Sequence, residues 1–400
     1  MERLVFHVDV NSAFLSWEAA RRVANGEPDL RLVPSAVGGD ASSRRSIIAA
    51  KSIPAKKYDI QTGEPVSLAL RKCPGLIVVE PDFALYRRCS HAFISICREY
   101  APVLEQFSID ECFLDMTGTS LIYPDPIKTA YEIKNRIRDE LGFTVNIGIG
   151  NNKLLAKMAS DFEKPDKVHT LFIDEIERKM WPLPVGDLFL AGKSSTKRLI
   201  AFGLNTIGDV ARHDREGLKK IVGDKMGGVL HDYANGVDNS AVSDETEDAK
   251  SYSMSTTLED DVTTRRQAQG IIRMLADNVS RRMRVDKAQA GGVSVTIRST
   301  EFVNKSHQRK LEEPTDISSE IFETAMELFD ELWDKKTPLR LLNVGLFDIS
   351  HDAPIQLSLF TDEKKEKSRK IDRTLDMLTD KFGKNTVMRG SEYKKDDTNL

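Results

Sequence analysis

The sequence lacks the features by which several classes of protein are recognised. No apolar run in its 400 residues approaches the roughly 18 residues that a membrane span needs. The N-terminus has no basic stretch followed by an apolar core and a small-residue cleavage site, so we expect neither secretion nor a membrane partner. The four cysteines form no CxxC pair and the seven histidines form no HxxxH pair. This argues against a disulfide framework or a zinc site and fits a reducing, cytoplasmic location.

Charge is nearly balanced over the whole chain but is unevenly distributed. The net charge of −4 argues weakly against a nucleic-acid partner, although the distribution of charge matters more than its sum. Residues 250–310 hold 12 Lys and Arg against 6 Asp and Glu, whereas residues 311–334 hold 9 acids and no base. A basic binding face with an acidic helix behind it would give this pattern. So would two solvated faces of a neutral module.

Adjacent acids stand in the middle of an apolar stretch, FSIDECFLD (residues 107–115). A buried charge is unfavourable without a partner, which makes Asp110 and Glu111 conspicuous. A third acid, Asp9, ends the alternating segment RLVFHVDV, which predicts a strand. Carboxylates at neighbouring strand ends are the ligands that two Mg²⁺ ions, roughly 4 Å apart, need for phosphoryl transfer. The alternative is an Asp-Glu pair in a hairpin turn that faces solvent.

Two similar layers of strands and helices are expected. The pattern before residue 172 indicates a βαββαβ-like sheet, interrupted by a small inserted segment at residues 20–80. Short helix–turn–helix units follow from about residue 175, and then an acidic linker. A second βαββαβ unit has strands expected near 252–257, 292–299, 306–312 and 340–348, with helices near 263–284 and 317–334. Within it, Val293, Val295 and Ile297 should face a core.

Four motifs stand in a recognisable order along the chain. They are HVDVNSAFLSWE (7–18), AVGGD with RRSIIAAKSIPAKKYDI (36–40 and 44–60), FSIDECFLD (107–115) and GIGNNKLLAKMASDFEKPDKV (148–168). Together they resemble the motifs of Y-family translesion DNA polymerases of the bacterial DinB/UmuC type. The triplet Gly38–Asp40 is also found in palm-fold nucleotide cyclases, but Ala41 and Ser42 stand where a cyclase has Glu-Phe.

The resemblance implies an α+β fold of the right-hand polymerase type. The expected parts are a ferredoxin-like catalytic palm (1–20 and 80–172), small fingers (21–79), a helical thumb with a helix-hairpin-helix (173–240), a linker (241–250), a βαββαβ little finger (251–350) and a tail (351–400).

It also implies roles for individual residues. Asp9 and Asp110 would bridge two Mg²⁺ ions, Glu111 would complete the catalytic-metal site, and the Val10 carbonyl would bind the nucleotide-bound ion. Phe14 would be the steric gate against a ribose 2′-hydroxyl, the alternative being an ordinary core phenylalanine. Lys164 and Lys56 would contact the dNTP triphosphate, although Lys164 could instead be an exposed lysine without a role.

The chain departs from the family pattern at four positions. Asn11 stands where a second Asp is usual, and Ala13 where an aromatic residue is usual. In the fingers, Ile53 and Lys56 replace a Tyr and an Arg that grip the triphosphate. Lys56 keeps the charge but cannot bind a phosphate with two parallel hydrogen bonds. These departures put nucleotide affinity and lesion preference in question, but not the metal ligands.

Two further segments resemble surfaces for DNA and for a partner. The thumb turn LAGKSS, with Gly192 and Lys193, resembles a helix-hairpin-helix phosphate site, or is a plain connecting turn. In the little finger, Arg298, Lys305, Arg309 and Lys310 could line a DNA groove. In IQLSLF (355–360), Gln356, Leu357, Leu359 and Phe360 resemble the pentapeptide that binds the bacterial sliding clamp (β subunit), or form a strand folded back on the little finger.

The sequence therefore predicts a template-directed, low-fidelity DNA-dependent DNA polymerase. The expected partners are primer–template DNA, dNTP and the sliding clamp, and we expect a monomer. The competing hypothesis is a catalytically impaired DNA-binding protein of the same fold, recruited by the clamp. The presence of Asp9, Asp110 and Glu111 argues against it.

Overall fold

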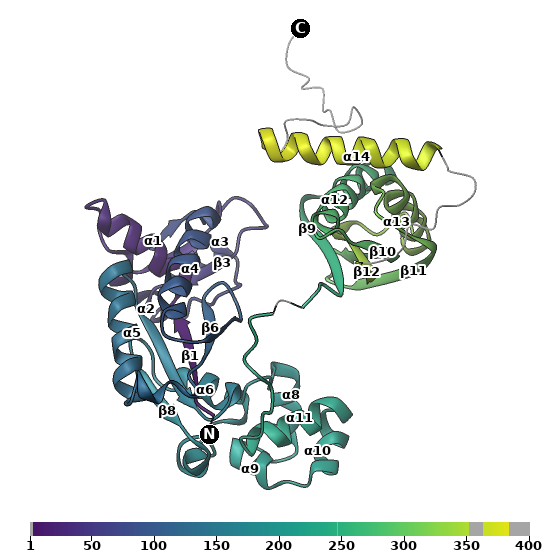
Figure 1. Ribbon diagram of the computed structural model, residues 1–400. Helices are drawn as coiled ribbons and strands as arrows, with labels where there is room; N and C mark the ends of the chain where they lie inside the picture. The colour runs from purple at the N-terminus through teal and green to yellow at the C-terminus, as the bar shows by residue number, and fades with distance from the viewer. Residues whose placement is uncertain (1–2, 246, 352–362, 384–400) are drawn as a thin grey trace. The chain divides into compact units, whose positions relative to one another are not determined.

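The computed structural model describes residues 3–245, 247–351 and 363–383 (Figure 1). The chain divides into two compact units, Met1–Thr246 and Glu247–Leu400. Each unit combines helices with its own β-structure, so the predicted α+β class is confirmed. Within the described residues, no helix is long and apolar enough to cross a membrane.

The first unit is built on a five-stranded sheet with the order β5-β6-β1-β7-β8. Its strands are β1 (Val5–Val10), β5 (Val103–Gln106), β6 (Glu111–Asp115), β7 (Val145–Gly150) and β8 (Val168–Leu171). The central strand β1 is antiparallel to both β6 and β7. The helices against it are α1 (Ala13–Ala24), α4 (Phe83–Arg98), α5 (Pro126–Leu141) and α6 (Lys153–Ser160), and a 3₁₀ turn, η2 (Thr119–Leu121), precedes α5.

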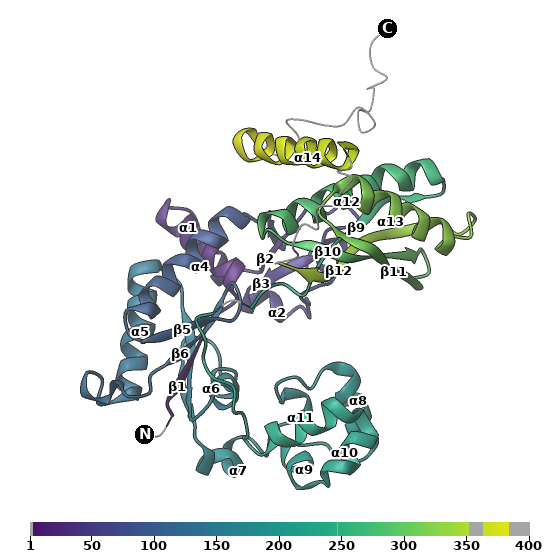
Figure 2. The same cartoon turned by 45° about the vertical axis from the view of Figure 1, so that its right-hand side comes forward.

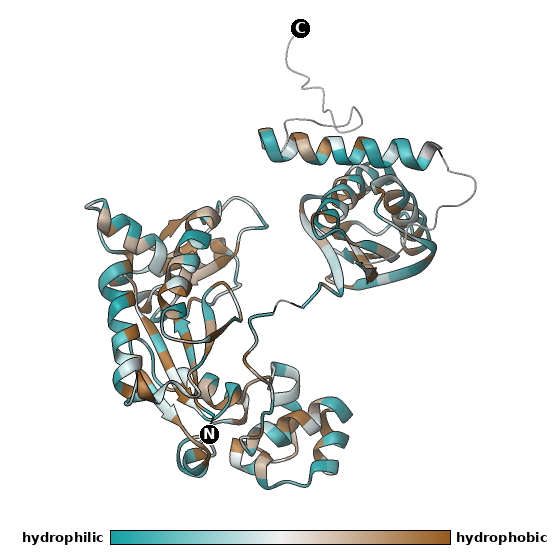
Figure 3. Cartoon of the chain, in the orientation of Figure 1, coloured by the Kyte–Doolittle hydropathy of each residue, from teal (hydrophilic) through white to brown (hydrophobic). Residues whose placement is uncertain are grey.

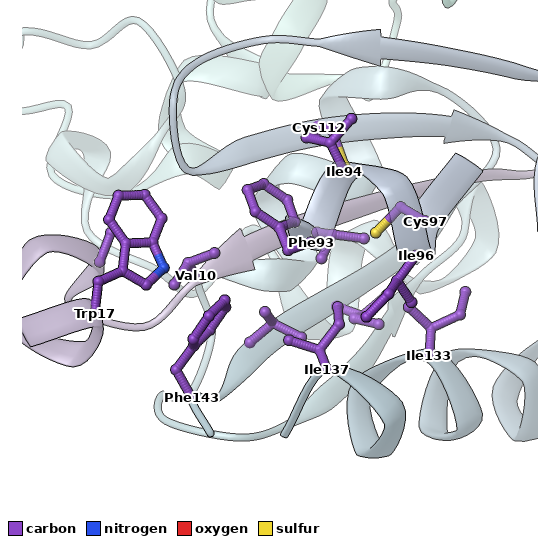
Figure 4. Close-up of a cluster of buried hydrophobic side chains, with 14 of the residues drawn as sticks. Val10, Trp17, Phe93, Ile94, Ile96, Cys97, Cys112, Ile133, Ile137 and Phe143 are labelled. Carbon is purple, nitrogen blue, oxygen red and sulfur yellow. The ribbon is translucent and has the colours of Figure 1, made fainter. Parts of the chain in front are cut away.

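The two faces of this sheet pack against different helices. Phe6, Val8 and Val10 join the main apolar core with side chains of α4 and α5, part of which Figure 4 shows. Val5 faces the other way and packs with Ala156 of α6. The predicted alternation along β1 is therefore confirmed. It follows that His7 and Asp9, on the same face as Val5, point toward α6.

Helix α6 lies very close to the sheet because glycine occupies the facing position of β7. A Cβ atom on Gly148 would lie 2.0 Å from the carbonyl oxygen of Ala156 and 2.4 Å from the amide nitrogen of Ser160. Any larger residue would push the helix away. Every residue from Leu154 to Ser160 is buried, because the other side of α6 packs against the helices that follow it.

Those following helices form an all-helical part of the same unit. They are α7 (Ile176–Lys179), α8 (Lys193–Ala201), α9 (Ile207–Arg212), α10 (Arg215–Val222) and α11 (Asp224–Ala234), with 3₁₀ turns η3 (Ile173–Glu175) and η4 (Val185–Asp187). Their core is continuous with Leu154, Leu155 and Met158 of α6. Helix α8 ends two residues before Gly203, which has a left-handed φ of 82°.

The segment inserted between α1 and α4 has its own small sheet and core. The sheet order is β3-β2-β4, with β2 (Ser35–Gly38), β3 (Ile48–Lys51) and β4 (Ile77–Val79). A 3₁₀ turn, η1 (Leu30–Leu32), precedes the sheet, and α2 (Ile53–Lys56) and α3 (Val66–Lys72) lie between β3 and β4. Some of its buried side chains, among them Ile48, Ile60 and Val66, form a separate cluster, whereas Val37 and Ala50 belong to the main core.

The second unit has the predicted βαββαβ order. Its elements are β9 (Ser251–Val262), α12 (Arg265–Val285), β10 (Gln289–Ser299), β11 (Asn304–Thr315), α13 (Ser318–Leu332) and β12 (Leu339–Ser350). The sheet order is β11-β10-β12-β9. Figure 2 shows α12 and α13 on one side of this sheet. Val293, Val295 and Ile297 are buried beneath those helices, as the alternation of β10 predicted.

A further helix, α14 (Glu363–Phe382), lies across α12 and α13 on the side away from the sheet (Figures 1 and 2). It is mostly hydrophilic, as Figure 3 shows, and it docks through ion pairs. Asp376 contacts Arg284 of α12 at 2.7 Å, and Arg369 contacts Asp316 at 3.0 Å. Asp372 accepts a hydrogen bond from the Ser318 amide at 2.8 Å. Because α13 has no side-chain cap of its own, Asp372 supplies one from a distant part of the chain.

Candidate active site

The register of two neighbouring strands places Asp9 opposite Glu111. Asp9 is the fifth residue of β1 and Glu111 is the first of β6, and the two are paired residues of the antiparallel ladder. Both side chains lie on the face that α6 covers. Asp9 is 7 % exposed, and Glu111 is partly buried. The structure therefore brings together two of the three acids that the sequence predicted, on the face opposite the main core.

The backbone of Asp110 lies close to the end of β1, but its side chain does not join those of Asp9 and Glu111. It lies in the turn before β6, where its carbonyl accepts a hydrogen bond from the Val10 amide at 3.0 Å. Its carboxylate accepts a hydrogen bond from the Ser108 hydroxyl at 2.6 Å. Among the described residues, no three His, Cys, Asp or Glu side chains are grouped so that they could hold a metal ion. The predicted cluster of three carboxylates is thus not assembled as a group.

Two lysines lie between the carboxylates. Lys157 Nζ is 3.0 Å from Glu111 Oε1 and 3.4 Å from Asp9 Oδ2. Lys164 Nζ is 3.0 Å from Asp9 Oδ2 and 2.8 Å from Asp161 Oδ1. The sequence singled out Lys164 but not Lys157. The structure shows that Lys157 is also directed into the site.

The two carboxyl groups have opposite pKa shifts. Burial raises the pKa of Asp9 from 3.8 to about 6, although Lys164 and Lys157 act in the other direction. Burial would also raise the pKa of Glu111, but His7 and Lys157 outweigh it, and that pKa falls from 4.5 to about 2. Burial likewise opposes the charged form of both lysines, but their carboxylate neighbours raise the pKa of each. The lysines therefore stay protonated.

A buried histidine lies beside the carboxylate of Glu111. His7 is fully enclosed, with Nδ1 2.8 Å from Ser160 Oγ and Nε2 3.3 Å from Glu111 Oε2. Burial lowers the pKa of His7 to about 4, so the ring is neutral at pH 7. The Ser160 hydroxyl also donates to the Lys157 carbonyl at 2.8 Å, which connects His7 to the helix that carries Lys157. His7 was not predicted, although its position two residues before Asp9 puts it on the same strand face.

The residues that the sequence predicts as Mg²⁺ ligands are only partly arranged to bind that ion. Asp9 and Glu111 offer the hard carboxylate oxygens that Mg²⁺ prefers, and their oxygens already converge on one cation, the Lys157 ammonium. Asp110 is adjacent through its backbone, but its carboxylate would have to leave Ser108 to join them.

The predicted steric-gate residue belongs to an aromatic cluster beside this site. Phe14 in α1 stacks on Tyr86 of α4 with ring centroids 4.6 Å apart and an interplanar angle of 10°. The Tyr86 hydroxyl donates to Glu18 at 3.0 Å, and Glu18 is 1 % exposed. Burial beside Glu18 raises the pKa of Tyr86. Phe14 itself is only partly buried.

Asn11, where an Asp was expected by resemblance, has a structural role. Its Oδ1 accepts hydrogen bonds from the Asp166 amide at 2.9 Å and from the Thr144 hydroxyl at 3.0 Å. Its Nδ2 donates to Asn146 Oδ1 at 3.1 Å. A carboxylate cannot donate, so Asp at this position would lose the last contact. Asn11 thereby ties the end of β1 to the loop that carries Lys164.

The other predicted nucleotide and DNA residues lie on different elements. Lys56 and Ile53 occupy the two ends of α2, and both are exposed. Gly192 is the N-cap of α8 and Lys193 its first residue. Leu190 has φ 68°, a left-handed conformation that glycine adopts with less strain. The backbone at Leu190 therefore has a conformation that is typical of glycine.

The cations predicted for the groove of the second unit lie on two faces. Arg309 pairs with Val293, and Lys305 with Ile297, across β10 and β11. Since these partners point toward the helices, Arg309 and Lys305 do so too, and Arg309 contacts Glu327 and Glu331 of α13. The prediction that they share a face with Arg298 and Lys310 is therefore wrong. Side chains alternate along a strand, and odd and even positions diverge.

The predicted clamp-binding residues Gln356, Leu357, Leu359 and Phe360 lie outside the described residues. The structure describes the chain on either side of them, as β12 up to Ser350 and α14 from Glu363.

Comparisons with known proteins cover nearly the whole chain. Residues 8–161 match the impB/mucB/samB family, and residues 249–359 match the C-terminal domain of that family. The chain is 42 % identical over 398 residues to a protein named DNA polymerase IV from Clostridium acetobutylicum, covering 99 % of this chain and 100 % of that protein. It is 35 % identical over 399 residues to DNA polymerase IV 1 of Bacillus subtilis, covering 99 % and 94 %.

The fold is similar to that of a solved polymerase. A Y-family DNA polymerase chimera superimposes with a TM-score of 0.76 over 86 % of this chain and 99 % of the other, at 22 % sequence identity. At this identity the likeness concerns the fold alone.

Proposed function

The chain belongs to the impB/mucB/samB family of Y-family DNA polymerases, and we propose that Asp9, Asp110 and Glu111 form its catalytic centre. It is a DNA-directed DNA polymerase of the DinB type that acts in translesion synthesis. As a DNA polymerase it binds primer–template DNA and dNTP and depends on divalent metal ions.

The observation that carries the assignment of the site is the cross-strand pair of Asp9 and Glu111 with Lys157 and Lys164 beside it. Two carboxylates that face each other across a ladder, one buried and one partly buried, repel unless cations offset them. In such an arrangement the carboxylates can bind a divalent cation, and the two lysines can contact phosphate oxygens. A purely DNA-binding protein has no use for it, which is why the catalytically impaired alternative is not favoured.

Divalent ions bound there, which we propose to be two Mg²⁺, would stabilise the charge on the attacking primer hydroxyl and on the leaving pyrophosphate. Asp9 and Glu111 provide oxygens on one side of the site, and Asp110 joins them when its side chain leaves Ser108. The Val10 carbonyl would complete the nucleotide side. Lys164, with one third of its side chain exposed, is placed to contact a triphosphate oxygen as a point charge.

Phe14 is the proposed steric gate. Its stacking on Tyr86, whose hydroxyl is bonded to the buried Glu18, holds the ring plane against sideways movement. A ring supported in this way can exclude a 2′-hydroxyl by contact, because it cannot turn aside. Lys56 would contact the triphosphate from the fingers with a single charge.

DNA and clamp contacts complete the proposal. The N-terminus of α8, with Gly192 and Lys193, can bind a backbone phosphate without reading sequence. Arg298 and Lys310 lie on the face of their sheet that α12 and α13 leave open, and would add salt-dependent contacts to phosphates. Residues Gln356, Leu357, Leu359 and Phe360 would bind the sliding clamp. We further propose a monomer that works in the cytoplasm.

Primer extension by site variants tests the catalytic assignment. Glu111→Ala and Asp110→Ala should each abolish extension in the presence of Mg²⁺, and primer–template binding, measured by fluorescence anisotropy, should stay within about two-fold because the basic surfaces lie elsewhere. Asp115→Ala, at the other end of β6, is a matched control and should extend normally. Near wild-type extension by either active-site variant would show that the assignment is wrong.

A further inference from the structure

Lys157 is an enclosed cation among three carboxylates. Its Nζ lies 3.0 Å from Glu111 Oε1, 3.4 Å from Asp9 Oδ2 and 3.5 Å from Asp161 Oδ2, and 10 % of its side chain is exposed. The helix that carries it is buried between the sheet and the following helices. The ammonium therefore lies inside the site, between the two carboxylates that are proposed to bind metal.

We propose that Lys157 is a positioning residue of the polymerase site, whose ammonium binds Asp9 and Glu111 in place of a divalent cation and moves to Asp161 when that cation binds. The proposal rests on the proposed function, because it takes Asp9 and Glu111 as metal ligands.

The first step of the argument is the charge of the cross-strand pair. Side chains of directly opposed residues in an antiparallel ladder lie about 5 Å apart, and like charges there are destabilising. Asp9 and Glu111 are such a pair. A cation between them offsets the repulsion and keeps their oxygens directed at one point. Lys157 meets this need, and so would a divalent ion at the same point.

The second step is that the two cations exclude each other. A Mg²⁺ ion binds carboxylate oxygens at about 2.0–2.1 Å, so it would lie almost in contact with an ammonium that stays 3.0 Å from Glu111 Oε1. Both are positive, and the site is largely shielded from water, where repulsion between charges is strong. Lys157 must therefore leave at least one of its two carboxylates before the ion can bind both.

The third step is that Asp161 offers the lysine another partner. Asp161 follows Lys157 by one helical turn at the end of α6, a spacing at which side chains meet. Each of its oxygens faces one lysine, with Oδ2 near Lys157 and Oδ1 at 2.8 Å from Lys164. A rotation of the Lys157 side chain toward Asp161 would keep its charge paired. Because Lys157 and Asp161 are four residues apart, this exchange is local to one helical turn.

The test is Mn²⁺ binding to the full chain without nucleic acid, which electron paramagnetic resonance measures. Lys157→Met removes the competing charge and should tighten Mn²⁺ binding on the order of ten-fold, the size of one charge-assisted contact. The same variant should unfold at a lower temperature in EDTA, because its carboxylates have lost a counter-ion. Asp161→Asn should weaken Mn²⁺ binding several-fold, because the displaced lysine has no charged partner.

Lys153→Met is the matched control. Lys153 lies on the same helix and contacts Glu105 at 2.6 Å, away from Asp9 and Glu111. Its variant should bind Mn²⁺ as the unchanged protein does. Tighter Mn²⁺ binding in Lys157→Met but not in Lys153→Met, together with weaker binding in Asp161→Asn, supports the exchange.

Unchanged or weaker Mn²⁺ binding in Lys157→Met overturns the proposal. If that variant does not fold, unchanged binding in Asp161→Asn overturns it instead. Glu111→Gln separates this failure from that of the proposed function. If Glu111→Gln abolishes Mn²⁺ binding while Lys157→Met has no effect, only the lysine exchange is wrong. If Glu111→Gln binds Mn²⁺ normally, the metal site itself is wrong.

Discussion

Neutralising Asp9 and neutralising Glu111 should change stability in opposite directions. Asp9 has a folded-state pKa of about 6, above its usual 3.8, so the folded protein holds that proton more tightly than the unfolded chain does. Its ionised form therefore opposes folding, and the protein loses stability as the pH rises from about 4 to about 6. Glu111 has a folded-state pKa of about 2, below 4.5. Its contribution is present above pH about 4.5 and is lost as the pH falls toward 2.

Each pKa unit corresponds to about 1.4 kcal/mol, which gives the size of the effect. For Asp9, a pKa of about 6 instead of 3.8 makes Asp9→Asn more stable by up to about 3 kcal/mol above pH 7 and by almost nothing near pH 4. For Glu111, a pKa of about 2 instead of 4.5 makes Glu111→Gln less stable by about 3 kcal/mol at neutral pH. Both variants should be inactive.

Thermal unfolding of the full chain in EDTA, at about pH 5 and about pH 8, measures both differences. The midpoint for Asp9→Asn should exceed that of the unchanged protein by several degrees at the higher pH, and the excess should shrink at the lower one. Glu111→Gln should have the lower midpoint at both. If Asp9→Asn is the less stable protein at about pH 8, the two lysines outweigh burial at Asp9, and our account of that residue is refuted.

Three further predictions concern other parts of the chain. Phe14→Ala should raise ribonucleotide incorporation relative to deoxyribonucleotide incorporation by roughly ten-fold or more, the effect expected from the loss of one steric contact. Measuring kcat/KM for both nucleotides checks this, and an unchanged ratio would assign the gate elsewhere. Replacing Leu359 and Phe360 together by Ala should abolish stimulation of synthesis by the clamp and spare synthesis without it, and stimulation that persists would place the contact elsewhere. Asp372→Ala should lower stability by about 1 kcal/mol, the worth of a helix cap, and unfolding in denaturant measures it; no change would mean that water caps Ser318 equally well.

Helix α14 illustrates a feature that local sequence could suggest but not explain. The stretch after residue 362 has a weak helical pattern of apolar residues and no obvious core to join. The structure shows that charged side chains of α14 contact the rest of its unit. Asp372 and Asp376 bind the amide of Ser318 and the guanidinium of Arg284. Charge pairs between elements far apart in sequence leave no periodic signal.

Surface charge was also misread where only strand register could decide it. Arg309 and Arg298 are both basic residues of one hairpin, and composition treats them alike. The pairing of Arg309 with Val293 puts it on the helix side, where Glu327 and Glu331 neutralise it. A shift of one residue along a strand reverses its face, so a predicted patch of cations needs the register before it can be trusted.

The sequence by itself determined the architecture and the strand positions of the acids that we propose as metal ligands. Alternation along β1 set the face of Asp9, helical spacing set the covering helices, and four ordered motifs pointed to the family. These signals are local, because strand and helix periods are properties of neighbouring residues. Tertiary structure alone decided what surrounds the acids. His7, Lys157 and Asp161 become one network only because Gly148 lets α6 approach the sheet. The pKa of each carboxyl depends on that burial and those charges, which no local pattern encodes.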